Sequence, residues 1–183
     1  MDEYLVPLET PCVYHDPDFI EQSEADAFYQ ELLKNIPWEK TAKINRWVHI
    51  CQERTKESSG DDNQEQQPQR NYAYKDAPSA SSSTYVNPPF PEAVQTIRKA
   101  CQDWYQQKHG GDPSFNVCLL NFYQDGTQRI GWHADREEIG RTTPIASVSL
   151  GTTRQFLIRS QQNFHDRCTP DLQNGPMVVM EPV

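Results

Sequence analysis

Apolar side chains recur with helical spacing in two parts of the chain. Within residues 20–36, Phe28, Leu32 and Ile36 follow one another at intervals of four, and Pro37 cannot continue a helix. A second set follows Pro91, a residue that suits the first turn of a helix, and its members share one face: Val94, Ile97, Cys101, Trp104 and Tyr105. The pattern therefore predicts two amphipathic helices, over residues 20–36 and from 91 to a stop near Gly110.

Other apolar positions alternate with polar ones or form short runs, which is typical of β-strands. Residues 44–51 alternate and are rich in β-branched and aromatic side chains. Further short apolar runs predict strands at 115–123, 145–150, 156–158 and 177–180. Because a helical and loop-rich first half precedes consecutive strands, we expect an α+β protein with a β-sandwich or jelly-roll core.

Residues 52–69 have no aliphatic or aromatic side chain. Nothing in this stretch can offset the entropy lost on ordering, so the composition predicts a long mobile loop. Residues 70–90 are rich in tyrosine and proline and predict an irregular segment or short edge strands.

Composition and charge restrict the function classes. The 183 residues suffice for one domain, which we expect to be a monomer, and carry a net charge of -9. That excess lies in residues 1–69, with 15 acids against 6 bases, whereas residues 70–183 are balanced at 11 against 11. The five cysteines form no C-x-x-C pair, which favours a reducing compartment. No apolar run approaches the roughly 18 residues of a membrane span. We expect no membrane contact and a location in the nucleus or cytoplasm.

Polar side chains with potential chemistry lie near the middle of the chain. Strand alternation places Asn121 and Tyr123 at the end of an apolar face. His133 and Asp135 would share one face of an extended segment, where an imidazole and a carboxylate could bind one metal. A second histidine would complete the facial triad of Fe(II) oxygenases. Equally, such a pair can be a surface histidine beside a solvated aspartate, and the other two polar groups can be an ordinary strand end.

The order of the motifs resembles the AlkB-type Fe(II)/2-oxoglutarate dioxygenases. The matching segments are Asn121-Phe-Tyr123, Gly126, Ile130, His133-Ala-Asp135-Arg-Glu137, Pro144-Ile145, Ser147-Val-Ser149-Leu-Gly151-Thr-Thr-Arg154-Gln-Phe156 and Arg159. The resemblance is strong over residues 116–180 and weaker over 70–108. It implies a double-stranded β-helix, or jelly roll, flanked by N-terminal helices.

The resemblance also implies a role for individual residues. His133 and Asp135 would be the catalytic iron ligands, and Asn121 and Tyr123 would bind 2-oxoglutarate. Glu137 would contact a flipped methylated base. Fe(II), 2-oxoglutarate as cosubstrate and O2 are the implied cofactors, and methylated DNA or RNA is the implied partner, so the expected activity is oxidative demethylation in DNA repair.

The segment before the core resembles the family's nucleotide-recognition lid. Tyr74 and Tyr85 would be lid aromatics that bind the substrate, although core packing of a loop explains them equally well. Cations such as Arg98, Lys99 and Lys108 could form a basic face or an ordinary solvated surface. The chain then divides into an acidic part with the mobile loop (1–69), a lid-like part with its supporting helix (70–114) and the β core (115–183).

The family's distal histidine and two arginines follow the strand that corresponds here to residues 175–180. The chain stops at Val183, and His165 is a poor substitute because it lies in a polar stretch. We therefore expect a core without its last strands, as a fragment of an enzyme or as an inactive product. The alternatives to a demethylase are a catalytically inactive β-sandwich that only binds, and a dioxygenase for a substrate other than nucleic acid.

Overall fold

Two units, each built from separate stretches of the chain, make up the computed structural model. It describes residues 3–40, 43–53, 72, 86–134 and 144–181. Unit 1 contains the described residues of Met1–Asn35, Trp104–Pro113 and Asp135–Val183, and unit 2 those of Ile36–Asp103 and Ser114–Ala134. Most of the predicted mobile loop, from residue 54 onward, lies outside the described residues.

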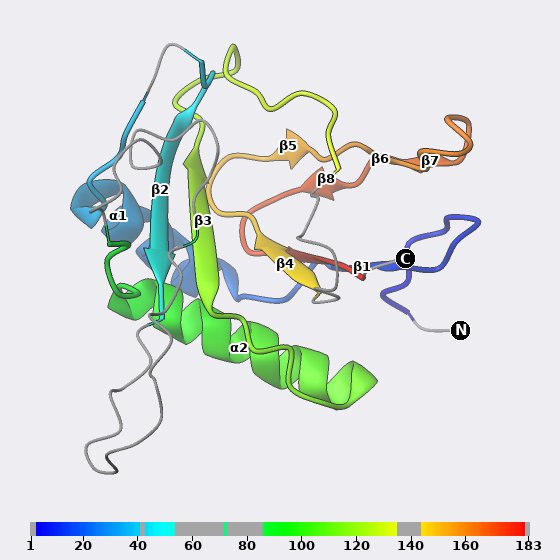
Figure 1. Cartoon of the computed structure of the whole chain (residues 1–183), viewed down its shortest axis with the longest axis horizontal. Coiled ribbons are helices and arrows are strands. Elements are labelled where there is room, and N and C mark those ends of the chain that lie inside the picture. Colours follow the sequence, from blue (N-terminus) through cyan, green and yellow to red (C-terminus); the bar gives the residue numbers. More distant parts are fainter. Residues whose placement is uncertain (1–2, 41–42, 54–71, 73–85, 135–143, 182–183) are drawn as a thin grey trace, which may run out of the picture. The chain divides into compact units, whose positions relative to one another are not determined.

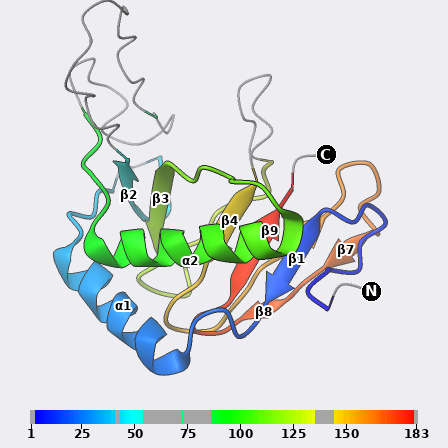
Figure 2. The same ribbon diagram turned by 90° about the horizontal axis from the view of Figure 1, so that it is seen from below.

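Unit 1 is organised around the strand β9 (Met177–Met180). It pairs antiparallel with β1 (Val13–Asp16) on one side and with β4 (Ile145–Val148) on the other, and Figure 2 shows the three strands side by side. Met177, Val178 and Val179 are almost fully buried, as expected for the central strand of a sheet. The remaining strands form two short antiparallel pairs: β5 (Arg154–Gln155) with β8 (Asp171–Leu172), and β6 (Ile158–Arg159) with β7 (Arg167–Cys168).

The helix α1 (Gln22–Asn35) is linked to the chain before β9 through a close backbone contact. The Ile20 N–H donates to the Gly175 carbonyl at 3.0 Å, and the Gly175 N–H donates to the Ser149 carbonyl at 2.8 Å. Gly175 has φ +105°, and a Cβ there would collide with the carbonyl oxygen of Ile20. Only glycine therefore fits this position without displacing backbone.

The last turns of α2 (Glu92–His109) belong to unit 1, where aromatic side chains surround His109. Its ring stacks on Tyr105 at 4.7 Å and meets Tyr14 edge-on at 4.6 Å. The Trp104 indole N–H donates to Asp16 at 2.8 Å. Burial, together with a hydrogen bond to Glu181, raises the pKa of Tyr105 to about 12. These contacts hold the end of α2 against β1.

Unit 2 is built on the antiparallel pair β2 (Trp47–Gln52) and β3 (Val117–Phe122), which run side by side in Figure 1. One face carries Cys51 and Cys118 at directly opposite positions. Both are free cysteines, and the Cys51 thiol donates a hydrogen bond to the Cys118 carbonyl at 3.9 Å. Hydrogen bonding with Cys118, together with burial, raises the pKa of Cys51. Burial also raises the pKa of Cys101, on α2, to about 12. These buried thiols stay protonated at neutral pH and are poor nucleophiles.

The structure confirms both predicted helices, as α1 and α2, and the predicted strand at 177–180 coincides with β9. The described residues contain two helices and antiparallel strand pairs, which agrees with the predicted α+β class. One strand prediction, 156–158, was wrong. The chain there divides between β5 and β6, because the opposing segment is itself interrupted between Cys168 and Asp171. In the described part of the chain, neither helix is long and apolar enough to cross a membrane.

Replacing Gly175 by alanine should lower the free energy of unfolding by about 2–4 kcal/mol, because the new methyl group collides with backbone. Gly111→Ala is the matched control: its φ is +83°, but no atom lies within 4 Å of the place that its Cβ would take, so only the backbone strain of about 1 kcal/mol applies. Urea unfolding of both variants measures the difference. If both variants lost the same free energy of unfolding, the collision at Gly175 would be contradicted.

Candidate active site

The predicted site residues that the structure describes all belong to unit 2. Asn121 is exposed in β3, Tyr123 follows this strand and is half-buried, and His133 is exposed further along. The other predicted site residues lie outside the described residues: Asp135, Glu137, Tyr74 and Tyr85.

Asn121 stands at the end of an apolar face. The register places Ile50 opposite Leu119 and Val48 opposite Asn121, so these side chains share one side of the strand pair. Val48 and Ile50 are buried in a cluster against which Leu119 packs. The alternation in the sequence correctly predicted that Asn121 shares the face of Leu119. The face therefore ends in an exposed carboxamide.

A buried arginine fixes the orientation of this carboxamide. Arg46 is only 5% exposed, and its Nε–H donates to Asn121 Oδ1 at 2.5 Å. A guanidinium has no acceptor, so the amide must turn its oxygen towards Arg46. The NH2 group of Asn121 is then the part of the side chain that can donate to a ligand.

The turn after β3 is held by side-chain hydrogen bonds. Asp125 accepts from the Thr127 N–H at 2.8 Å and from its hydroxyl at 2.6 Å, and these bonds lower the pKa of Asp125. The side chain of Gln128 is 4% exposed, and its Oε1 accepts from the Gln124 N–H at 2.9 Å. The bonds from Thr127 to Asp125 form an Asx turn, which is a common way to reverse the chain after a strand.

Asn45 ties this turn to the start of β2. Its side-chain NH2 donates to the Thr127 carbonyl at 3.1 Å, and its own carbonyl accepts from the Arg129 N–H at 3.2 Å. Asn45 and Arg46 are neighbours in sequence. Asn45 therefore holds the segment that leads to His133, and Arg46 holds Asn121.

His133 has the nitrogen arrangement of a metal-binding histidine. Its Nδ1 lies 2.8 Å from the Gly131 carbonyl oxygen, which can only accept a hydrogen bond, so this contact favours a proton on Nδ1 and makes Nε2 the candidate metal-binding nitrogen. Histidines that bind metals commonly donate the other ring N–H to a backbone carbonyl in this way. Residues 130–134 belong to no strand. Within the described ranges, no group of three or more His, Cys, Asp or Glu side chains could hold a metal.

Two buried amides hold Tyr72 on the apolar face. Gln52 Oε1 accepts from the Tyr72 N–H at 3.0 Å and from the Asn87 NH2 at 3.1 Å. Asn87 also donates to the Tyr72 carbonyl at 2.8 Å. Tyr72 packs on the same apolar cluster as Leu119. The predicted lid-like segment is thereby anchored at Tyr72.

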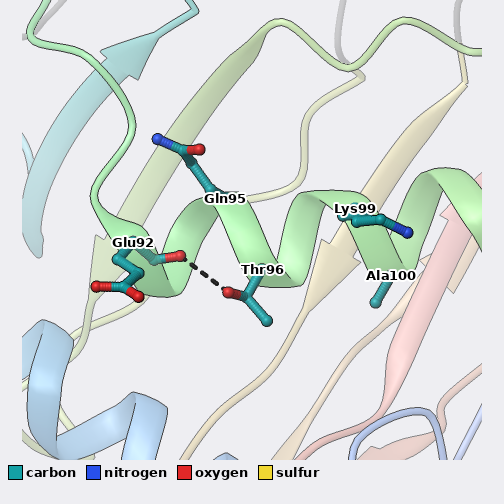
Figure 3. Close-up of a pocket in the computed structure, with 5 residues that line it drawn as sticks. All are labelled: Glu92, Gln95, Thr96, Lys99 and Ala100. Carbon is teal, nitrogen blue, oxygen red and sulfur yellow. Dashed lines mark hydrogen bonds between the residues drawn. The ribbon is translucent and has the colours of Figure 1, made fainter.

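A hollow of about 430 Å³ lies on the outer side of α2 (Figure 3). Its wall contains a hydrogen bond from the Thr96 hydroxyl to the Glu92 carbonyl, at 3.1 Å. None of the predicted site residues lines it, so it contributes nothing to the candidate site. The residues that line it are Glu92, Gln95, Thr96, Lys99 and Ala100.

The sequence reasoning missed Arg46, Gln52 and Asn87. A signal for Arg46 was present, because it continues the alternation of Val48 and Ile50 and so belongs to the same face. The identity of its partner depends on which strands pair. Gln52 continues the same alternation after Ile50, whereas Asn87 gave no periodic signal.

Comparisons with known proteins agree with the resemblance. The profile of the 2OG-Fe(II) oxygenase superfamily matches residues 12–183. Alpha-ketoglutarate-dependent dioxygenase alkB homolog 3 of Bos taurus is 27% identical over 175 residues, which are 90% of this chain and 54% of that protein. DNA oxidative demethylase ALKBH2 of Mus musculus is 30% identical over 178 residues, 88% of this chain and 64% of that protein. The chain thus spans somewhat more than half the length of these relatives.

Asn87→Leu should lower the free energy of unfolding by about 1–3 kcal/mol, because it keeps the branched shape of the side chain but removes the NH2 group that donates to the Tyr72 carbonyl and to Gln52. Hydrogen exchange of the Tyr72 amide should accelerate as well. Asn116, which is exposed, supplies the control: Asn116→Leu should change stability by no more than about 0.5 kcal/mol. Indistinguishable variants in urea unfolding would show that the amide network stabilises nothing.

Proposed function

This chain belongs to the 2OG-Fe(II) oxygenase superfamily, and we propose that it serves Fe(II)- and 2-oxoglutarate-dependent oxidative demethylation of methylated bases in DNA or RNA. The observation that carries the proposal is the run of AlkB-type motifs from Asn121 to Arg159, within the matched region. The names of the relatives support the same reaction class. The jelly-roll core is part of this proposal.

The described residues suit the cosubstrate. 2-Oxoglutarate carries two carboxylates, which accept hydrogen bonds. The Asn121 NH2 and the Tyr123 hydroxyl are donors, and both come from the same end of β3. Asn121 is already oriented by Arg46, so little ordering entropy is lost when a carboxylate binds.

The metal would be held by His133 Nε2 and by Asp135. The nitrogen fits this role because Nδ1 is occupied by the Gly131 carbonyl. Bound Fe(II), with 2-oxoglutarate and O2, supplies the oxidation of the N-methyl group. The protein's contribution is to place the cosubstrate and the methyl group beside the metal and to exclude water.

A methyl group on a base edge cannot be reached inside a duplex, so the base must be flipped or single-stranded. Glu137 is proposed to contact this base, with Tyr74 and Tyr85 stacking against the substrate. The buried amides of Gln52 and Asn87 hold Tyr72, which precedes these tyrosines in the sequence.

The cations on α2 do not support a simple phosphate-binding face. Lys99 pairs with Asp103 at 2.6 Å, and Arg98 pairs with Glu53 at 2.8 Å. Lys108 lies 3.9 Å from Glu3. Since each of these three cations has a carboxylate beside it, the alternative of an ordinary solvated surface is favoured over a basic face on this helix.

His133→Ala should abolish binding of Fe(II), or of Mn(II) as an air-stable probe, with a change in unfolding free energy of at most about 0.5 kcal/mol, because the side chain is exposed. Metal titration and urea unfolding of the protein at its full natural length measure the two effects. His165→Ala removes another exposed histidine and should leave metal affinity unchanged. Unchanged affinity in His133→Ala would reject the ligand assignment.

The reaction itself is tested with Fe(II), 2-oxoglutarate and an oligonucleotide that contains 1-methyladenine or 3-methylcytosine. We expect equal amounts of succinate and formaldehyde, and neither product in His133→Ala. If the protein binds iron and turns over 2-oxoglutarate without releasing formaldehyde, the nucleic-acid substrate is wrong. If it binds iron but yields no succinate, the inactive alternative holds.

A further inference from the structure

Arg46 occupies an unusual place for a charged side chain. It precedes β2 by one residue and is 5% exposed. The register that pairs Trp47 with Phe122 continues by one residue to the positions of Arg46 and Tyr123. Burying a guanidinium costs several kcal/mol unless good hydrogen bonds compensate. Its position is therefore tied to the end of β3 where the cosubstrate residues lie.

The bond from Arg46 to Asn121 selects one of two orientations of an amide. In the observed orientation Oδ1 accepts the Nε–H at 2.5 Å. In the reverse orientation two donors would face each other, which is repulsive in a buried setting. The exposed Asn121 therefore presents its NH2 group, which suits a carboxylate and not a second donor.

The charge of Arg46 also favours a carboxylate as the ligand of Asn121. A hydrogen bond from a cation polarises the amide and makes its N–H groups stronger donors. A fixed positive charge behind the amide also favours an anion over a neutral ligand, and this attraction is screened less than at the surface. The ligand meets the exposed Asn121, while Arg46 acts from behind it.

We propose that Arg46 is a positioning residue for the cosubstrate: it holds the Asn121 carboxamide with its NH2 group ready to bind a carboxylate of 2-oxoglutarate. The inference rests on the proposed function for the identity of the dicarboxylate. Arg46 acts through Asn121, so the loss of Arg46 should weaken cosubstrate binding and leave the chemical step intact.

Calorimetric titration of 2-oxoglutarate into the Mn(II)-loaded protein measures binding without turnover. Arg46→Met should raise the Kd about tenfold or more, in line with the loss of a charge-assisted hydrogen bond. Arg46→Lys keeps the charge but not the fixed Nε–H, and should fall between this variant and the unmodified protein. In turnover, the KM for 2-oxoglutarate should rise by a similar factor while kcat at saturation changes less than about twofold.

Two controls separate positioning from loss of charge and loss of fold. Arg129→Met removes an exposed cation from the same unit and should leave the Kd unchanged. A double-mutant cycle of Arg46→Met with Asn121→Ala should show strong coupling, because Arg46 acts on the ligand through Asn121. Additive effects would overturn the proposal.

Nuclear magnetic resonance of the protein without cosubstrate tests the contact itself. The Arg46 Nε–H signal should be protected from exchange, and Asn121→Ala should remove this protection. If Arg46→Met proves unfolded, this signal and the Arg46→Lys titration still decide the matter. The role of Arg46 is overturned if folded Arg46→Lys binds 2-oxoglutarate with the same Kd as the unmodified protein and the Arg46 Nε–H is not protected from exchange. This outcome would leave the proposed function itself intact. Failure of the unmodified protein to bind 2-oxoglutarate overturns the proposed function as well.

Discussion

The antiparallel register between β2 and β3 is the constraint on which the candidate site depends. Side chains alternate between faces, so a slip of one residue would move Asn121 to the opposite face of the pair. The pairing extends beyond the strands, where the Glu53 N–H donates to the Asn116 carbonyl at 2.8 Å, and the other edge of β2 is occupied by Glu39, which exchanges backbone hydrogen bonds with Val48. The buried side chains of the apolar cluster add a penalty for any other pairing.

What the sequence predicts well is what depends on local periodicity. Both helices and β9 follow from spacing alone, and so does the face that Asn121 shares with Leu119. The bond between Arg46 and Asn121 joins residues 75 positions apart, and a single polar contact leaves no repeat in the sequence. β1 escaped prediction because His15 and Asp16 break its apolar pattern, although its pairing with β9 buries it. The functional roles of all the predicted site residues, including Asn121, His133 and Asp135, remain predictions.

The spatial arrangement of the cysteines also could not be predicted from the sequence. From the sequence, the five cysteines indicated only a reducing compartment. The fold places Cys51 opposite Cys118, with Cys101 of α2 near enough for its pKa to be influenced by Cys118. The positions look random along the chain, but Cys51 and Cys101 are both buried thiols with raised pKa values that stay protonated at neutral pH. The proposed cosubstrate site lies at the other end of β3, where Asn121 is exposed.

Stability alone does not account for a buried arginine at that end. An apolar residue of similar volume beside Val48 would avoid the desolvation cost, and replacements of this kind in other proteins are often neutral or stabilising. The hydrogen bond to Asn121 itself adds little to stability, because Asn121 is exposed and could bond to water instead. A residue that disfavours folding locally is expected where function requires it. Orienting a donor for an anionic ligand is the function that the contact of Arg46 with Asn121 supports.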